Sequence, residues 1–401
     1  MLDSYRTVFA HRGALAFSAT GMLARLPISM MTLGIVLLVS SVTGSYTQAG
    51  QVSAAYIVGN AIAAVPHGRL ADRLGQTAVL YADAVLFALT TGMLVHATTH
   101  DWSAPWPHLW AALSGATLPQ IGSLVRARWA HIVGTEAERH TAFAVEAVGD
   151  EVVFVTGPAL VTFLSTLRAP ETGLIAALAL GTVGTVLLAL QPATAPAVHP
   201  REHEAPAVAM PWSRLVPLAA AAVALGALFG ALEVATVATA EDAGHKAASG
   251  VLLALFSLGS MVAGLVAGAV HWKVPDHRRF RIGTAVLAAA MLALPFVGDL
   301  VALGVLFLFV GLSLAPGLIA VVSLLEASTP RSRLTEAMAV FQTGISAGIA
   351  PGAWLAGFVA DRASGSAAYW VCVVSGALAL AAAFWCRPAP ASPATASSLP
   401  A

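Results

Sequence analysis

The sequence predicts an all-α membrane protein in which twelve transmembrane helices form two six-helix bundles. Three observations lead to this fold class. Of the 401 residues, 58% are hydrophobic and only 10% are charged, whereas a soluble domain carries about 25% charged residues. The apolar residues fall into twelve runs, most of them about long enough to cross a bilayer. One polar, proline-rich stretch separates the first six runs from the last six.

The composition also excludes several classes of protein. So few charges cannot cover the surface of a soluble protein of this size, which argues against a cytosolic enzyme or a disordered chain. The 20 basic and 20 acidic residues balance, so there is no basic excess to bind a nucleic acid. The chain has no nucleotide-binding loop, no HExxH zinc motif and no nucleophile–base pair. We expect no enzyme activity, no metal site and no cofactor.

The first half is predicted to form the N-terminal bundle, residues 1–190. Charged clusters and Gly/Pro turns bound each apolar run. The run from Ala14 to Val39 is too long for a cleaved signal peptide, and further spans follow it. The six expected spans are 14–40, 49–67, 77–96, 108–130, 140–164 and 171–190.

Residues 191–212 are predicted to be a cytoplasmic linker, because five prolines stand there among charged residues and histidines. Residues 213–387 are expected to form the C-terminal bundle. The tail at 388–401 is rich in Pro, Ala and Ser and is expected to be disordered in the cytoplasm. The six spans of this half are 214–238, 247–271, 282–298, 300–322, 336–360 and 368–386.

The basic residues set the orientation. With both termini in the cytoplasm, sixteen basic residues fall on the cytoplasmic side, and only Arg168, Lys246 and Arg362 fall outside. Cytoplasmic loops of membrane proteins carry this excess of Lys and Arg. The preference for Arg over Lys and the abundant alanine suggest a bacterial source. We expect a multi-pass protein of the cytoplasmic (inner) membrane that works as a monomer.

One loop identifies a family. Between the second and third spans the chain reads Gly68-Arg69-Leu70-Ala71-Asp72-Arg73-Leu74-Gly75-Gln76-Thr77. This resembles the signature of the major facilitator superfamily, Gly-x-Leu-Ala-Asp-Arg-x-Gly-Arg-Lys, at the place where that family keeps it. The chain departs from the signature at its last two positions, where the family has basic residues.

The resemblance implies the major facilitator fold and a transporter that works by alternating access. It also implies that this loop latches the cytoplasmic gate, a role that it assigns to Gly68, Asp72, Arg73 and Gly75. We expect Asp83, near the cytoplasmic end of the third span, to be a partner of the loop.

Ionisable side chains inside a bilayer are costly, so each is a candidate functional residue. Arg25 is expected near the middle of the first span, and Glu146, Asp150 and Glu151 lie in the fifth. The resemblance places both spans at the cavity of the first half, so we expect Arg25 to pair with Asp150 or Glu151. Carboxyl groups in a low-dielectric cavity can bind and release protons. We therefore expect this cluster to couple protons to transport.

Structural alternatives stay open for these residues. Glu146 could instead pair with Arg126 or Arg128, and Arg25 could bond backbone carbonyls near Pro27. Glu233, in the seventh span, is expected in the outer third of the membrane, with the extracellular gate as one role and a structural role as the other.

Polar and aromatic residues on the expected cavity helices are candidates for contact with the substrate. These residues are Tyr56, Asn60, Gln120, Phe154, Gln342 and Trp354. We expect proton-coupled export of a small amphipathic compound, with the bilayer and that compound as the partners. The alternatives are proton-coupled uptake or facilitated flux of a sugar-like or other polar metabolite, flipping of a lysolipid, and a receptor or scaffold that transports nothing.

Overall fold

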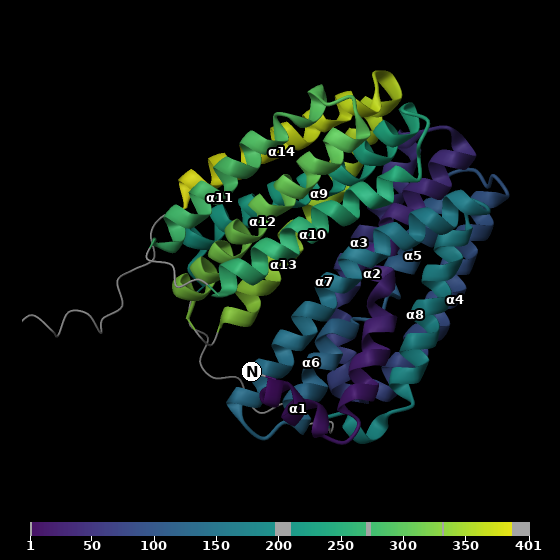
Figure 1. The fold of residues 1–401 in the computed structure, drawn as a ribbon. Helices are drawn as coiled ribbons and strands as arrows, with labels where there is room; N and C mark the ends of the chain where they lie inside the picture. The colour runs from purple at the N-terminus through teal and green to yellow at the C-terminus, as the bar shows by residue number, and fades with distance from the viewer. Residues whose placement is uncertain (1, 197–209, 270–273, 331–332, 387–401) are drawn as a thin grey trace, which may run out of the picture.

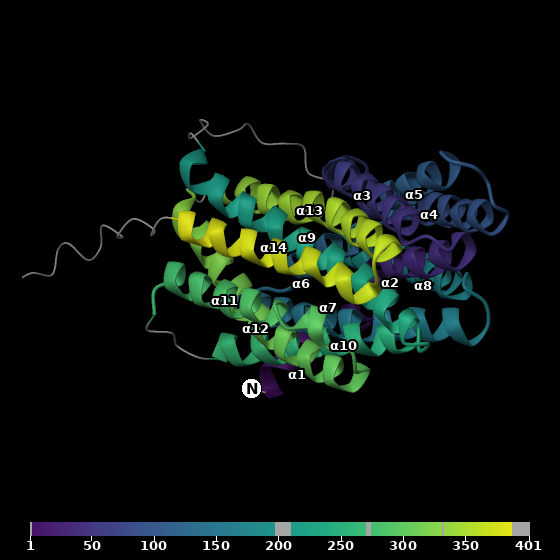
Figure 2. The same cartoon turned by 90° about the horizontal axis from the view of Figure 1, so that it is seen from above.

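The computed structural model describes residues 2–196, 210–269, 274–330 and 333–386. Within these ranges the chain forms helices and no strands. Helices of the first half and helices of the second half form two bundles, which meet at the upper right of Figure 1 and separate towards the lower left. Figure 2 shows the same two bundles from above. The all-α fold expected from the composition is confirmed.

The first half begins with a short helix, α1, that the sequence did not predict. Its fourth expected span is two helices, α5 and α6, because the helix breaks beside Pro119, whose nitrogen has no hydrogen to donate. The helices are α1 (Leu2–Ala10), α2 (Ala14–Thr43), α3 (Tyr46–Leu74), α4 (Gln76–Thr99), α5 (Trp106–Ala116), α6 (Ile121–Ile132), α7 (Glu136–Leu167) and α8 (Thr172–Ala189).

The second half follows the predicted spans with two larger differences. Helix α11 begins six residues earlier than expected and is followed by a 3₁₀ turn, and α12 ends six residues later than expected. The elements of this half are α9 (Trp212–Asp242), α10 (Ala248–Ala269), α11 (Asp276–Met291), the 3₁₀ helix η2 (Leu294–Phe296), α12 (Leu300–Ser328), α13 (Leu334–Arg362) and α14 (Gly365–Trp385).

Ten helices of the described chain are long and apolar enough to cross a membrane. The expected second and fourth spans fall outside this criterion for different reasons. Helix α3 has 29 residues but includes polar ones such as Gln51 and Asn60. The fourth span is divided into α5, with 11 residues, and α6, with 12.

Small residues let the helices pack closely. Within the first bundle, α3 packs on α5, and Gly59 lies against the backbone carbonyl of Ala112. Between the bundles, α3 packs on α13 and α7 on α10. A Cβ atom at Gly50 would lie 2.6 Å from the Ala353 carbonyl oxygen of α13. Close approach of backbones through small residues is the usual way in which membrane helices associate.

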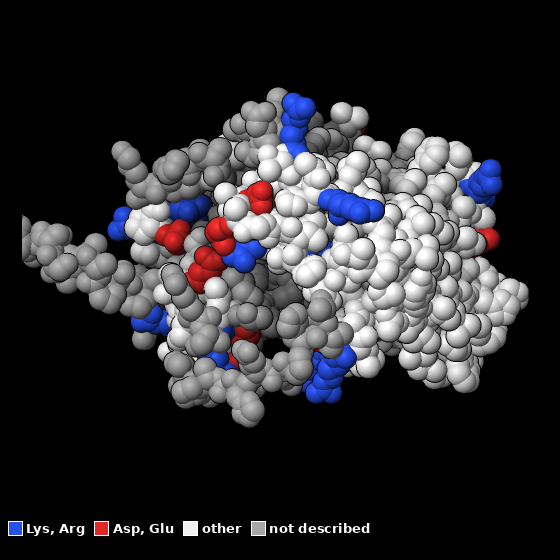
Figure 3. Space-filling model, turned by 90° about the horizontal axis from the view of Figure 1, so that it is seen from below, with Lys and Arg blue, Asp and Glu red and all other residues white. Residues whose placement is uncertain are grey.

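The charged side chains gather at the ends of the molecule. Figure 3 shows most of them towards one end, a broad region without charge beside them, and a few at the opposite end. We call the first the Arg73 end, because α3 ends there. We call the other the Lys246 end, after the connection from α9 to α10. The charge-free band between the ends suits a bilayer.

The start of the expected linker is ordered against the first bundle. A 3₁₀ helix, η1 (Pro192–Thr194), follows α8. The buried Arg128 donates to the Gln191 carbonyl at 2.8 Å and to the Thr194 hydroxyl at 2.9 Å. The rest of the expected linker, at 197–209, and the expected disordered tail, at 388–401, lie outside the described residues.

Candidate functional site

A cavity of about 650 Å³ lies between the two halves. Its wall is mostly apolar, and it includes residues of α2, α3, α7, α9, α10, α12 and α13 together with the break between α5 and α6. A volume of this size is typical of sites for small molecules. The two halves therefore enclose a candidate binding site for a small molecule.

The charged side chains in the cavity wall are Glu151 of α7 and Glu233 of α9, one from each half. No Lys, Arg or His is among the described residues of the wall. The Oε1 atom of Glu233 is buried and has no hydrogen-bond partner among the described residues, although the Thr32 hydroxyl lies beside the carboxyl group. The cavity thus offers negative charge and hydrogen-bond acceptors within an apolar surface.

Five of the six residues expected to face the substrate lie in the wall, namely Tyr56, Asn60, Gln120, Phe154 and Gln342. The prediction for Trp354 was wrong, because its ring packs against Phe358 with the centroids 6.2 Å apart, outside the cavity. Helical geometry explains the difference. Ile345 and Ile349, three and seven residues after Gln342, share its face of α13. Trp354 comes twelve residues after Gln342, about 120° around the helix.

A buried network of charges lies inside the first bundle. Arg25 of α2 donates to Asp150 at 2.8 Å and pairs with Glu146. Arg126 of α6 donates to the other oxygen of Asp150 at 2.6 Å. Glu146 also accepts from the indole nitrogen of Trp129 at 2.7 Å. Arg25 and Glu146 are each 1% exposed, so their opposite charges offset the cost of burial.

Acidic side chains that are close together in the sequence of α7 point in different directions. Glu146 and Asp150 are four residues apart and share the face that packs on α2. Glu151 lies about 100° further around the helix and, with Phe154 and Pro158, faces the cavity. The acidic cluster of the fifth span therefore divides into two buried network residues and one cavity residue.

Two expected pairings change as a result. Arg25 pairs with Asp150, one of the two partners expected, but its second partner is Glu146 and not Glu151. Glu146 bonds neither Arg126, which pairs with Asp150, nor Arg128. Arg128 instead holds Gln76 at 2.9 Å and the chain after α8. The sequence gives the depth of a residue along its helix, whereas the direction in which its side chain points decides its partner.

The signature residues lie at the Arg73 end. Gly68, Asp72 and Arg73 belong to the last turns of α3, and Gly75 alone joins α3 to α4 with a φ of 83° that favours glycine. The side chains of Asp72 and Arg73 are exposed and bond no other described residue. Asp83 pairs with His67, the residue before Gly68, at 3.1 Å, and not with the charged residues of the motif.

The bundles are joined at the Lys246 end. Asp361, near the end of α13, accepts hydrogen bonds at 2.7 and 2.8 Å from the backbone N–H groups of Tyr46 and Thr47, which begin α3. Glu241 of α9 accepts from the Tyr46 hydroxyl and pairs with Lys246. Glu233, which we expected at the extracellular gate, instead lines the cavity. Glu241, about two turns later on the same helix, makes the contact between the two halves.

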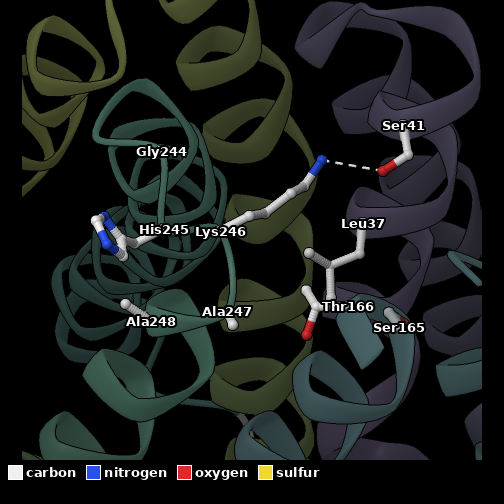
Figure 4. A pocket seen from close by; sticks show the side chains of 9 residues that line it. All are labelled: Leu37, Ser41, Ser165, Thr166, Gly244, His245, Lys246, Ala247 and Ala248. Carbon is white, nitrogen blue, oxygen red and sulfur yellow. Dashed lines mark hydrogen bonds between the residues drawn. The ribbon is translucent and has the colours of Figure 1, made fainter. Parts of the chain in front are cut away.

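A second pocket, of about 560 Å³, lies beside these contacts. Figure 4 shows Lys246 reaching from the second half towards Ser41 of α2, with a hydrogen bond of 3.0 Å. Ser165 and Thr166 of α7 line the same pocket. Residues of both halves therefore line this pocket, at the end where the halves contact each other.

Sequence reasoning missed several residues of these sites. Trp129 and Ser18 both bond Glu146, and neither is ionisable, so a search for charges overlooks them. Asp361 lies next to the last residue of α13, and its position in the sequence gives no sign of a partner on α3. The break beside Pro119 carried a signal, because a proline inside an apolar run removes a backbone donor.

The sequence model of the Major Facilitator Superfamily matches residues 17–316 and, in a second match, residues 218–399. No curated protein matches the sequence.

The solved structures that share the fold include three transporters. The POT family transporter PepTSo has a TM-score of 0.74 at 10% identity, with 92% of this chain and 95% of that chain covered. A D-xylose-proton symporter gives 0.71 at 14% identity, with 94% and 98% covered. The nucleoside transporter NupG gives 0.69 at 17% identity, with 92% and 98% covered. At such identities the likeness shows the fold alone.

Proposed function

The chain belongs to the major facilitator superfamily of membrane transporters, and we propose that it exports a small amphipathic cation in exchange for protons. One observation carries the proposal. The charged side chains described in the cavity wall are two carboxylates, Glu151 and Glu233, in apolar surroundings without a basic group. Such a site attracts a cation, and its carboxyl groups can take a proton when the cation leaves.

The orientation of the protein is part of this proposal. The positive-inside rule puts the Arg73 end in the cytoplasm. The halves are joined at the Lys246 end through Asp361 and Glu241, whereas Asp72 and Arg73 are unbonded among the described residues. We therefore assign the structure to a state closed to the outside, with the cytoplasmic latch of the signature motif released.

The carboxylates of the buried network and those of the cavity wall differ in how readily they can take a proton. Asp150, Glu146 and Arg25 form a network whose charges compensate one another. A proton added to Glu146 or Asp150 would break ion pairs, whereas Glu151 and Glu233 are paired with no base among the described residues. We propose that Glu151 and Glu233 carry the proton and that the network holds α2, α6 and α7 in register.

The test is an exchange assay with purified protein in liposomes that enclose a pH-sensitive dye. Tetraphenylphosphonium is a suitable probe, because its permanent charge prevents it from carrying protons itself. External probe should make the lumen alkaline, and Glu151→Gln or Glu233→Gln should abolish the response. Glu326→Gln is the matched control, because Glu326 is exposed outside the cavity wall. A response that survives both cavity substitutions would refute the assignment of the coupling residues.

A second candidate is proton-coupled uptake of a polar metabolite. It is favoured by the amide groups of Asn60, Gln120 and Gln342, which all line the cavity. The solved structures with this fold include a D-xylose-proton symporter and a nucleoside transporter. The sign of the pH change separates the candidates. A symporter given xylose or uridine would make the lumen acidic, whereas exchange of a cation for protons makes it alkaline.

A further inference from the structure

The end of α4 carries two histidines on one face of the helix. His96 and His100 are four residues apart, a spacing that makes side chains neighbours on a helix surface. Their rings contact each other with the centroids 4.1 Å apart, and both side chains are exposed. Helix α4 starts at the Arg73 end, so its last turn lies at the Lys246 end. Two adjacent imidazole groups are therefore accessible from solvent at that end.

The backbone around these histidines is held by the way the helix ends. Asp101 has a φ of 51°, a conformation that aspartate adopts more readily than most residues. The Trp102 N–H donates to the Ala97 carbonyl at 2.9 Å, and the Asp101 N–H donates to the Thr98 carbonyl at 3.3 Å. These two bonds form a Schellman motif, which closes the helix. The same turn brings the Trp102 ring edge-on to His96, with the centroids 5.7 Å apart.

Hydrogen bonding fixes which nitrogen of His100 carries the hydrogen. Its Nδ1 atom lies 3.0 Å from the His96 carbonyl oxygen, which can only accept. The other neighbour of Nδ1 is the Thr99 hydroxyl, which donates to the Val95 carbonyl at 2.9 Å. Nδ1 is therefore the donor, and Nε2 of the neutral ring keeps its lone pair. A histidine that binds a metal ion almost always donates its other N–H in this way.

The second lone pair comes from His96, whose ring nitrogens bond no other described residue. Two histidines four residues apart on one helix face are the pair that the HExxH motif uses for zinc. Neutral imidazole suits Zn²⁺, Cu²⁺ and Ni²⁺. Among the described residues, no group of three or more His, Cys, Asp or Glu side chains could hold a metal ion. Water would therefore complete the coordination of an ion bound by this pair.

We propose that His96 and His100 form a binding site for one divalent transition-metal ion, such as Cu²⁺ or Zn²⁺, at the outer end of α4. The proposal departs from our expectation of no metal site, because contact between two rings cannot be read from the sequence. It goes beyond the proposed transport function, since α4 contributes no described residue to the cavity wall. The orientation that we propose puts the site on the outer side of the membrane.

Copper is the probe for the test, because Cu²⁺ has the highest affinity of these ions for nitrogen ligands and quenches nearby tryptophan fluorescence. Full-length protein in detergent, freed of any purification tag, is titrated with Cu²⁺ while its tryptophan fluorescence is followed. Electron paramagnetic resonance of the one-to-one sample counts the bound nitrogens. Every sample carries four substitutions that remove the thiols and the other histidine pair of this spacing, namely Cys372→Ser, Cys386→Ser, His199→Gln and His203→Gln.

This parent protein should bind one ion through two nitrogens. His96→Gln or His100→Gln should weaken binding at least tenfold, because even the loss of a hydrogen-bond partner of a ligand typically costs about 10–100-fold. His245→Gln is the matched control. His245 also lies at the Lys246 end, and its Nδ1 is 2.8 Å from the Ala243 carbonyl, but no second histidine ring contacts it among the described residues. This variant should bind copper as the parent does.

Trp102 reports where the ion lies. Trp102→Phe should reduce the quenching and leave the affinity measured by resonance unchanged, because the indole lies beside His96 and is no ligand. An affinity that is unchanged in both His96→Gln and His100→Gln would overturn the proposal. So would quenching that Trp102→Phe does not reduce, or a resonance signal from fewer than two nitrogens. The last result is obtained on the parent protein and does not depend on the folding of any variant of the site.

Discussion

Arg25 and Asp150, which are 125 residues apart in the sequence, form a hydrogen bond of 2.8 Å between α2 and α7. The same arginine pairs with Glu146, and the same aspartate accepts from Arg126. Two cations and two anions thus compensate one another inside the first bundle. Breaking such a network leaves a buried charge without a partner, so its members should differ in their effect on stability according to their burial.

Arg25→Met should lower the free energy of unfolding by about 3–5 kcal/mol, because it leaves the buried Glu146 unpaired. Arg126→Met should cost only about 1 kcal/mol, because the Arg126 side chain is 36% exposed and water screens its ion pair. Thermal unfolding of the purified variants in detergent measures both effects. Equal losses in the two variants would contradict the graded burial of the network.

Helix α3 should depend on Gly59 for its packing. An added Cβ atom would overlap the Ala112 carbonyl of α5, so Gly59→Ala should destabilise the fold by about 1–3 kcal/mol. Gly68→Ala on the same helix is the control, because nothing lies within 4 Å of the Cβ atom it would add. The melting temperatures of the two variants are compared with that of the wild type. A loss of stability in Gly68→Ala as large as that in Gly59→Ala would count against this packing.

The closed Lys246 end should loosen when Asp361 is replaced. Asp361→Ala removes acceptors that hold the first turn of α3 to α13. The population open to the outside should then rise about fivefold, as a loss of about 1 kcal/mol implies. The readout is alkylation of Thr32→Cys in the cavity wall by an impermeant maleimide added outside cells, in a background with Cys372→Ser and Cys386→Ser.

Asp299→Ala is the control for this experiment. Asp299 also accepts a hydrogen bond from the start of a helix, from the Ala302 N–H at 2.8 Å, but within one half of the protein. It should leave the alkylation rate at the wild-type value. A rise in Asp299→Ala as large as that in Asp361→Ala would show a general loosening and not an opening between the halves.

The signature motif should matter for transport and little for the stability of this state. Asp72 is exposed and bonds no other described residue. Asp72→Ala should therefore change the free energy of unfolding by no more than about 0.5 kcal/mol. If the motif latches the opposite state, the rate of probe-driven pH change in liposomes should nevertheless fall. A variant with full transport would refute the gate role that we propose for Asp72.

Several features could be read from the sequence, because they depend on composition and spacing. Apolar runs of sufficient length predict spans, and Gly68 to Gly75 carry the family resemblance. Because charge is rare inside membrane spans, the sequence alone points to Arg25, Glu146, Asp150, Glu151 and Glu233. The positions of Tyr56 and Asn60 on a cavity helix were also predicted correctly.

Other features could not be read in this way, because they depend on which way a helix face turns. Glu151 faces the cavity and Asp150 faces Arg25, although they are adjacent in the sequence. Trp354 points away from the cavity by the same geometry. Asp361 joins the halves only because α13 ends beside the start of α3.

The sequence by itself determined that the chain lies in a membrane, that it has two halves, and that a few ionisable groups are buried there. These properties follow from transfer free energies, which depend on residue type and segment length. Tertiary structure alone decided which carboxylates are paired and which face the cavity, because side-chain direction and helix packing bring together residues distant in the chain. It also placed the unbonded N–H groups of Gly122 and Ser123 in the cavity wall, because residue type does not show which backbone N–H groups lack a partner.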